Sequence, residues 1–342
     1  MIGWPEVIST LQEMRDKMRV AIGQFSELTD ERLTFAEQLG VSGVQLNTPA
    51  IPSEKGYWEY SDLKSLKDKV EDRGLRLEAL ENVPIHFYDK VMLGLSGRDQ
   101  QIENYQATIT NMGRAGIPIL GYHWMPNGVW RTPPVNGRGG ATVTAFDADL
   151  INMQPLTAGT RELDILEGGT ISHSEMWDNY IFFMEAVVPV AEESGVKLAL
   201  HPDDPPVPIL GGVARLFHEP EGFQRALDAV PSLNSGLDFC MGCFSEMGPG
   251  VVESIRRFGS MDKIFYVHFR DVQGHVPCFQ ECFIGEGNVD VIDAMRTLKE
   301  IGFSGFIIDD HVPTMVNDSN YSGRAHATGY ITALVDAVMK LC

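Results

Sequence analysis

Residues 197–201 read Lys-Leu-Ala-Leu-His, a short apolar run that ends on a side chain able to bind a metal ion. The next three apolar runs of the chain end in the same way, at Cys240, at His268 and at Asp310. Similar runs rich in Val, Ile, Leu and aromatic residues recur along the whole chain, and longer stretches of helical period separate them. This alternation is typical of repeated β and α units, so the sequence predicts an α/β fold with a parallel sheet.

The number of apolar runs decides the architecture. The predicted strands are Arg19–Gly23, Gly43–Leu46, Arg76–Val83, Ile117–His123, Lys197–His201, Gly236–Cys240, Ile264–His268 and Gly305–Asp310. The predicted helices are Asp30–Leu39, Ser61–Arg73, Asp99–Ala115, Glu175–Ser194, Pro220–Ala229, Gly250–Phe258, Val289–Ile301 and Arg324–Leu341. Eight strands that alternate with eight helices predict a (β/α)₈ TIM barrel, with a capping helix at Glu6–Lys17 and one domain over residues 1–342. An open, doubly wound sheet is the alternative fold.

The segment from Thr132 to Thr170 interrupts this alternation because it has no clear periodicity. Its Pro133-Pro134 pair and its Gly137-Arg-Gly-Gly140 stretch indicate irregular backbone. Since the segment follows the fourth strand, it would lie at the end of the barrel that carries active sites. We expect it to be either a lid over the site or a surface insertion.

The composition excludes several classes of protein. The chain has 342 residues, with 27 Lys and Arg against 47 Asp and Glu, which gives a formal net charge of −20. Such an acidic balance without a basic stripe argues against nucleic-acid binding. No apolar run approaches the length of about 20 residues that spans a membrane, and the N-terminus lacks the order of a secretory signal. The five cysteines suit a reducing compartment better than a disulfide framework, so we expect a cytoplasmic protein.

Cys240 and Cys243 match the C-x-x-C spacing of redox proteins. They follow a strand-like run far from the N-terminus, and the sequence places no basic neighbour beside them that would lower the pKa of a thiol. A redox role is therefore not favoured.

The four strand ends predict a metal site. In a barrel the carboxyl ends of the strands surround one mouth, so His201, Cys240, His268 and Asp310 would converge there despite their separation in sequence. A single His or Cys after an apolar run is more often structural, but four in register on adjacent strands indicate a shared ion. Two imidazoles, a thiolate and a carboxylate suit divalent Mn, Fe, Co, Ni or Zn and not the oxygen-rich cages of Mg or Ca.

Polar residues beside these four would line the same mouth. His311 follows the last of them directly, and an unligated His near a cation can act as a general base because the positive charge keeps it neutral. Arg270 could bind a substrate carboxylate through a bidentate contact or form a salt bridge with a neighbouring acid. Asp203 and Asp204 could orient His201, touch the substrate or belong to a solvated turn.

Several short motifs occur in a fixed order around these residues. They are His201-Pro-Asp-Asp-Pro-Pro206, Gly236-Leu-Asp-Phe-Cys240, Val267-His268-Phe-Arg270 and Asp309-Asp310-His311, with further matches in Glu81-Asn-Val-Pro-Ile-His86, Ile102-Glu-Asn-Tyr105, Tyr122-His-Trp-Met-Pro126, Trp130-Arg-Thr132 and Val188-Pro-Val-Ala-Glu192. In order and spacing they resemble the mannonate dehydratase family of the xylose-isomerase-like barrels. The first 50 residues differ from the usual opening of that family.

The resemblance implies a hydro-lyase of carbohydrate metabolism that converts D-mannonate into 2-dehydro-3-deoxy-D-gluconate and water. It implies a divalent metal, usually manganese or iron, on the positions that match His201, Cys240, His268 and Asp310. It also implies a catalytic His at His311 and a homo-oligomer that takes a small sugar acid. The candidates for binding this substrate are Arg270, Asp203, Asp204 and His123.

In the family a Tyr shortly after the strand-eight His takes part in acid and base chemistry. Tyr321 matches it if a gap is allowed, whereas an ungapped match places Ala325 there, beside His326. A metal-dependent isomerase or epimerase, or a β-eliminase acting on a keto-glycoside, would need no such Tyr and is the alternative enzyme. A sugar-binding barrel without activity is the alternative outside enzymes.

Overall fold

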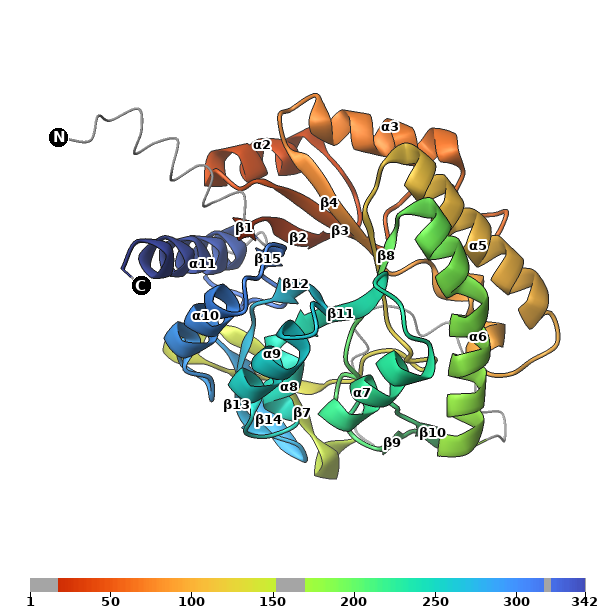
Figure 1. The fold of residues 1–342 in the computed structure, drawn as a ribbon. Helices are drawn as coiled ribbons and strands as arrows, with labels where there is room; N and C mark the ends of the chain where they lie inside the picture. The colour runs from red at the N-terminus through yellow and green to blue at the C-terminus, as the bar shows by residue number, and fades with distance from the viewer. Residues whose placement is uncertain (1–17, 152–169, 317–320, 342) are drawn as a thin grey trace.

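The computed structural model describes residues 18–151, 170–316 and 321–341 of the chain. Parallel strands form a barrel at its centre, and helices surround the barrel (Figure 1). The TIM barrel predicted from the sequence is therefore confirmed, while the predicted capping helix at Glu6–Lys17 lies outside the described residues. No helix in the described ranges is long and apolar enough to cross a membrane.

The central sheet of the described chain runs in the order β1, β15, β12, β11, β8, β5, β4, β3, β2. Its strands are Arg19–Val20 (β1), Ile22–Phe25 (β2), Gly43–Asn47 (β3), Arg76–Glu81 (β4), Ile119–Tyr122 (β5), Lys197–Leu200 (β8), Ser235–Cys240 (β11), Ile264–His268 (β12) and Phe306–Ile308 (β15). The first predicted strand is divided at Ala21 into β1, which pairs with β15, and β2, which pairs with β3. β1 and β2 stand at the two ends of the strand order, and Ala21 alone separates them in the chain. The sheet therefore closes on itself as a barrel, which excludes the open, doubly wound alternative.

Helices cover the outside of the barrel. The longer ones are Asp30–Leu39 (α2), Tyr60–Glu71 (α3), Arg98–Ala115 (α5), His173–Ser194 (α6), Pro220–Ala229 (α7), Val251–Gly259 (α9), Val291–Glu300 (α10) and Tyr321–Leu341 (α11), and the short ones are Asp89–Met92 (α4) and Met241–Glu246 (α8). The start of α6 is a capping box, in which the Glu175 backbone N–H donates to Ser172 Oγ at 3.3 Å and the Glu175 carboxylate accepts from the Ser172 backbone N–H at 3.0 Å. Two of the four backbone N–H groups that a helix start leaves free are thereby satisfied.

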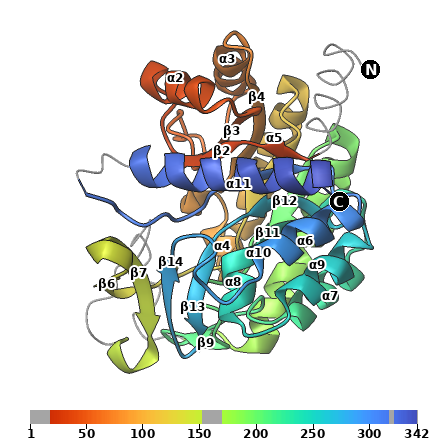
Figure 2. The same ribbon diagram turned by 90° about the vertical axis from the view of Figure 1, so that its left-hand side faces the viewer.

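A four-stranded antiparallel sheet lies beside the barrel (Figure 2). It consists of Thr132–Asn136 (β6), Thr142–Asp147 (β7), Asp271–His275 (β13) and Cys278–Cys282 (β14). The irregular backbone expected after strand four is therefore wrong for β6 and β7, and the glycines at 139 and 140 form the turn between them. Phe146 packs with Val272 and Phe279, so two insertions that are distant in sequence share one small core. Residues 152–169 lie outside the described ranges, and the lid stays a prediction.

The barrel has two apolar layers. The larger cluster contains residues of strands and helices and lies between them. The smaller one contains barrel residues alone and fills the inside, with Ala21, Ala79, Ile119, Ala199, Phe265, Tyr266, Phe306 and Ile308 as members. Gly121 in β5 leaves room within this layer, because a Cβ there would lie 2.2 Å from the hydroxyl of Tyr266. That hydroxyl donates to Glu81 at 3.1 Å, where the apolar interior gives way to a polar site.

Candidate active site

The four predicted metal ligands lie together at the carboxyl end of the barrel. One donor atom from each of His201, Cys240, His268 and Asp310 lies within 4.8 Å of every other. The Asp310 Oδ2 atom is 3.6 Å from Cys240 Sγ and 3.8 Å from His268 Nδ1, and the two imidazole rings are 5.3 Å apart. Cys240 and His268 end their strands, whereas His201 follows β8 directly and Asp310 comes two residues after β15. The folded barrel thus brings together four residues that are spread over more than a hundred positions of the sequence.

Buried partners hold the two imidazoles in place. His268 Nε2 lies 3.0 Å from Glu81 Oε2 and 3.3 Å from Asp238 Oδ2, which fixes one side of the ring. Its Nδ1 is buried without a hydrogen-bond partner in the described structure and faces Asp310. His201 Nδ1 lies 2.7 Å from the carbonyl oxygen of Pro202, which leaves its Nε2 for the centre of the site. A buried nitrogen without a partner is costly, and this donor set fits a divalent transition metal that would satisfy it.

The charges around the site also favour a cation. Burial alone would raise the pKa of the Cys240 thiol, but its contact with Cys243 and the charge of Arg270 hold that pKa well below its usual value. Burial would lower the pKa of His201, yet its hydrogen bond with Cys240 and the charge of Asp238 raise that pKa to about 10. Without an ion the cluster therefore retains protons on imidazole, and a bound divalent cation would displace them.

Arg270 lies beside the candidate metal cluster, where its guanidinium makes several buried salt bridges. Its guanidinium, 1% exposed, lies 2.7 Å from Glu246, 2.8 Å from Glu281 and 2.9 Å from Asp310. It also lies 3.3 Å from Asp204. Of the two roles considered for Arg270, this geometry favours the salt bridge, because its nitrogens already face acids.

The C-x-x-C pair also lies against this guanidinium. Arg270 Nη2 is 3.5 Å from Cys240 Sγ and 3.1 Å from Cys243 Sγ. The absence of a basic neighbour in the sequence was misleading, since the barrel supplies one from the next strand. The described cysteines are nevertheless free thiols, and Cys240 is one of the four candidate metal ligands.

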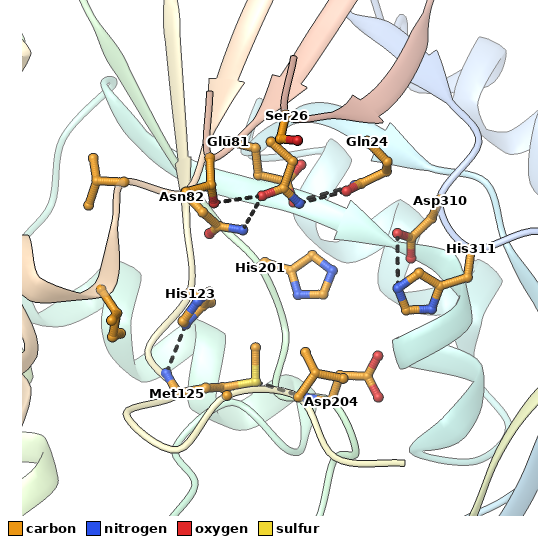
Figure 3. Close-up of a pocket in the computed structure, with 16 residues that line it drawn as sticks. Gln24, Ser26, Glu81, Asn82, His123, Met125, His201, Asp204, Asp310 and His311 are labelled. Atoms are coloured by element: carbon orange, nitrogen blue, oxygen red, sulfur yellow. Dashed lines mark hydrogen bonds and ion pairs between the residues drawn. The ribbon is translucent and has the colours of Figure 1, made fainter. Parts of the chain in front are cut away.

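His311 lines the cavity beside the cluster (Figure 3). Its Nδ1 donates to Glu281 Oε1 at 2.7 Å, and its Nε2 lies 3.7 Å from Asp310 Oδ1. Burial would lower the pKa of His311, but the charges of Asp310 and Glu281 raise it. Glu281 Oε1 also accepts a hydrogen bond from Arg131 Nη2 at 3.0 Å. The His311 ring is therefore held by a carboxylate that is itself ion-paired within the antiparallel sheet region.

Of the other predicted substrate contacts, Asp204 and His123 line the cavity and Asp203 does not. Asp204 lines the cavity and forms a buried salt bridge with Arg131, while Asp203 lies away from it and accepts from the Phe217 backbone N–H at 2.6 Å. In the described structure neither carboxylate hydrogen-bonds to the ring of His201, whose Nδ1 faces a backbone carbonyl instead. His123 lines the cavity, and its Nδ1 accepts from the Met125 backbone N–H at 3.2 Å. Burial lowers the pKa of His123 to about 3, so this ring is neutral and offers Nε2–H as a donor.

The structure does not bring Tyr321 to the cavity. Its ring packs on Phe35 of α2 with centroids 4.6 Å apart, because the chain enters α11 on the outside of the barrel. His326, one turn further on, packs on Phe283 at 5.2 Å. Neither is among the described residues that line the cavity.

The cavity itself has a volume of about 480 Å³. Its described lining residues are Gln24, Ser26, Asn47, Thr48, Glu81, Asn82, Val83, Ile85, His123, Met125, Gly128, Val129, His201, Asp204, Asp310 and His311. No Lys or Arg is among them. A small polar ligand in this cavity would therefore meet imidazoles and the candidate metal ligands on one side and neutral amides on the other.

Sequence reasoning gave no role to three residues that support this site, although Glu81 and Arg131 stand in the motifs that resemble the family. Glu81 ends β4 and holds His268, while Glu281 and Arg131 come from the segments that form the antiparallel sheet. Glu81 carried a usable signal, since it is an acid at the end of an apolar run like Asp310. Glu281 carried none, because only the fold brings β14 to His311.

The chain is similar to known proteins along most of its length. The family model described as D-mannonate dehydratase (UxuA) matches residues 18–342. The mannonate dehydratase of Thermotoga maritima is 31% identical over 335 residues, which cover 88% of this chain and 92% of that protein. Mannonate dehydratase 2 of Halalkalibacterium halodurans is 28% identical, with 94% of this chain and 99% of that protein covered.

Solved structures give the same picture. The crystal structure of mannonate dehydratase from Streptococcus suis serotype 2 has a TM-score of 0.83 and 28% identity, with 94% of both chains covered. An L-ribulose 3-epimerase structure has a TM-score of 0.60 and 15% identity over 94% of this chain and 95% of that one. At that identity the second likeness concerns the fold alone.

Proposed function

The chain belongs to the mannonate dehydratase family, a family of sugar-acid hydro-lyases, and on that premise we propose that it converts D-mannonate into 2-dehydro-3-deoxy-D-gluconate and water. The observation that carries this proposal is the cluster of His201, Cys240, His268 and Asp310 beside His311 in one cavity. The cavity volume of about 480 Å³ suits a small sugar acid.

The metal ligands are proposed to be the four clustered side chains, with Mn²⁺ or Fe²⁺ as the ion. The unpartnered Nδ1 of His268 and the lowered pKa of the Cys240 thiol support this assignment. When bound, the divalent cation supplies electrostatic stabilisation of negative charge on the oxygens of the substrate.

The reaction requires two proton movements. The C2 proton is weakly acidic because it lies next to the carboxylate, and the C3 hydroxyl needs a proton as it leaves. His311 is proposed as one of the two groups, since Glu281 occupies its Nδ1 and leaves Nε2 on the cavity side. The neutral His123 donates a hydrogen bond from Nε2 to the substrate from the opposite wall.

Incubation with D-mannonate tests the proposal. Protein shown to hold one Mn²⁺ per chain should form the 2-keto-3-deoxy acid, and His311→Ala should abolish its formation. His275→Ala is the matched control because this exposed imidazole contacts its own loop at Val276, and its activity should equal that of the wild type. Metal-loaded protein that forms no keto acid would overturn the mannonate assignment.

One observation favours a second candidate, a metal-dependent isomerase or epimerase, or a β-eliminase acting on a keto-glycoside. Tyr321, the match to the family's acid or base Tyr, packs against Phe35 and not in the cavity. The same incubation separates isomerisation or epimerisation from dehydration, because either gives a product of unchanged mass. Mass spectrometry of the reaction mixture therefore distinguishes these two reactions, and a second incubation with a keto-glycoside tests β-elimination through release of the aglycone.

A further inference from the structure

Three residues of the cavity have an unusual backbone conformation. Gln24, Thr48 and Asn82 have φ angles of 65°, 42° and 58°, and they lie at the carboxyl ends of β2, β3 and β4. In the described chain one further non-glycine residue, Asp262, has a positive φ, and it lies at the opposite end of the barrel. This conformation is costly for side chains other than glycine and concentrates where a fold places side chains for function.

The side chains at these strand ends are joined in a row. Asn47 Nδ2 donates to Gln24 Oε1 at 2.6 Å, and Asn82 Nδ2 donates to Asn47 Oδ1 at 3.2 Å. Thr48 Oγ1 also donates to Asn47 Oδ1, at 3.0 Å. We call Gln24, Asn47 and Asn82 the amide row. All three line the cavity, so the row is a surface that a ligand meets.

Glu81 ties the amide row to the metal cluster. Its Oε1 accepts from Asn47 Nδ2 at 3.3 Å and from Gln24 Nε2 at 3.5 Å. Its Oε2 accepts from His268 Nε2 at 3.0 Å. The row therefore lies one carboxylate away from a metal ligand, at a fixed distance from the reacting end of any bound molecule.

The chemistry of the row matches hydroxyl groups. Amides both donate and accept hydrogen bonds, as hydroxyls do, and the Oδ1 of Asn82 is buried without a partner in the described structure. No Lys or Arg lines the cavity within the described residues, so this side does not suit a second negative charge. Val83 and Ile85 beside the row offer apolar contact to C–H groups.

From this geometry we propose that the amide row is the subsite for the C5 and C6 hydroxyls of the sugar acid, at the end remote from its carboxylate, and sets the preference for chain length. The carboxylate and C2 of the substrate then face the metal cluster and His311. This inference rests on the proposed function for the orientation of the substrate.

The test compares two substrates in two variants. L-Erythronate repeats the C2 and C3 configuration of D-mannonate and ends at C4, so it keeps a C4 hydroxyl and lacks the distal hydroxyls at C5 and C6. Asn82→Gly removes a side chain whose recorded hydrogen bond goes to Asn47, and glycine accepts the positive φ without strain. Asp262→Gly makes the same change at the far end of the barrel and is the matched control.

In the wild type, kcat/KM should be higher for D-mannonate than for L-erythronate. Asn82→Gly should lower kcat/KM about 10-fold for D-mannonate and leave L-erythronate within about twofold, as expected for the loss of one hydrogen bond to the distal part. Asp262→Gly should leave both values unchanged. An equal loss on both substrates in Asn82→Gly would overturn the subsite, because the row would then act by supporting the metal cluster.

A binding experiment tests the subsite independently of the proposed reaction. D-Mannitol carries the same distal hydroxyls without a carboxylate, and its dissociation constant can be measured by calorimetry whether or not D-mannonate is dehydrated. Weaker binding to Asn82→Gly than to the wild type and Asp262→Gly supports the subsite. Equal binding to all three, or no binding to the wild type, contradicts it. If only the proposed function is wrong, D-mannonate is not dehydrated, but mannitol still binds more weakly to Asn82→Gly than to the wild type and Asp262→Gly.

Discussion

The Nδ1 atom of His311 donates to Glu281 Oε1 at 2.7 Å, and Glu281 belongs to β14, outside the strands of the barrel. The antiparallel sheet therefore acts on the cavity through His311, since none of its strand residues is among the described lining residues. Glu281 is itself buried and receives Arg131 and Arg270 at 3.0 Å and 2.8 Å. Three segments of the chain thus fix the orientation of one imidazole.

Glu281→Gln should lower kcat about 10-fold to 100-fold with little change in KM, because the amide holds His311 less firmly while the cavity wall is kept. Steady-state kinetics with D-mannonate measures both constants. Glu286→Gln is the control, since this carboxylate pairs with the exposed Arg138 and not with His311. A rise in KM with kcat unchanged would show that Glu281 acts on substrate binding instead.

Arg131→Met should destabilise the fold by about 3 to 5 kcal/mol, because it leaves the carboxylates of Asp204 and Glu281 buried with one cation fewer. The Arg131 side chain is 3% exposed and that of Asp204 is 2% exposed. Arg138→Met, at a side chain that is 56% exposed, should change stability by no more than about 0.5 kcal/mol. Denaturant unfolding of both variants gives the comparison, and equal effects would contradict the buried network.

Metal binding should release protons near neutral pH. Without an ion, Cys240 and the charge of Asp238 raise the pKa of His201 to about 10 against the effect of burial, so the ring is protonated below that pH. A metal binds the neutral ring, so apparent affinity should rise with pH, about tenfold per pH unit for each proton released.

Calorimetry of Mn²⁺ binding in buffers of different ionisation enthalpy counts these protons. Cys278→Ser, at an exposed thiol outside the cluster, should leave both proton release and affinity unchanged. Cys240→Ser should weaken binding strongly, since it removes a proposed ligand. Binding without proton release would contradict the protonated state of the free cluster.

Tyr321→Phe should keep kcat within about threefold of the wild type, because the ring contact with Phe35 survives and the hydroxyl lies away from the cavity. Tyr321→Ala should lower the thermal midpoint through the loss of that contact. If Tyr321→Phe instead lowered kcat by about two orders of magnitude, Tyr321 would be an acid or base of the reaction, as the resemblance to the family implies.

The sequence was sufficient for the barrel and for the clustering of its strand ends. His201, Cys240, His268 and Asp310 could be grouped because parallel strands deliver their last residues to one edge. Contacts made by insertions could not be foreseen in the same way. Nothing in the sequence of β14 points to His311, since that pairing depends on how two hairpins pack on each other.

Arg270 illustrates a second limit. A charged residue at the mouth of a barrel suggests a substrate contact. The Arg270 side chain, however, is buried and pairs with Glu246, Glu281 and Asp310. Burial and the charge of Asp204 raise the pKa of Glu246 to about 8, which reflects how densely acids gather there. The number of acids that fold around one guanidinium depends on tertiary structure and has no periodic signature.

The carboxylate of Glu81 has a consequence for attempts to change which sugar acid the enzyme accepts. Because one of its oxygens holds His268 and the other holds Asn47, replacing it would alter the ion and the recognition surface at once. Variation at Gln24, Thr48 and Asn82 avoids this coupling, since none of their recorded side-chain hydrogen bonds goes to His268. Libraries aimed at new substrates are therefore best built on these three positions with Glu81 kept constant, and with Gly, Asn and Asp as the replacements that their positive φ angles tolerate.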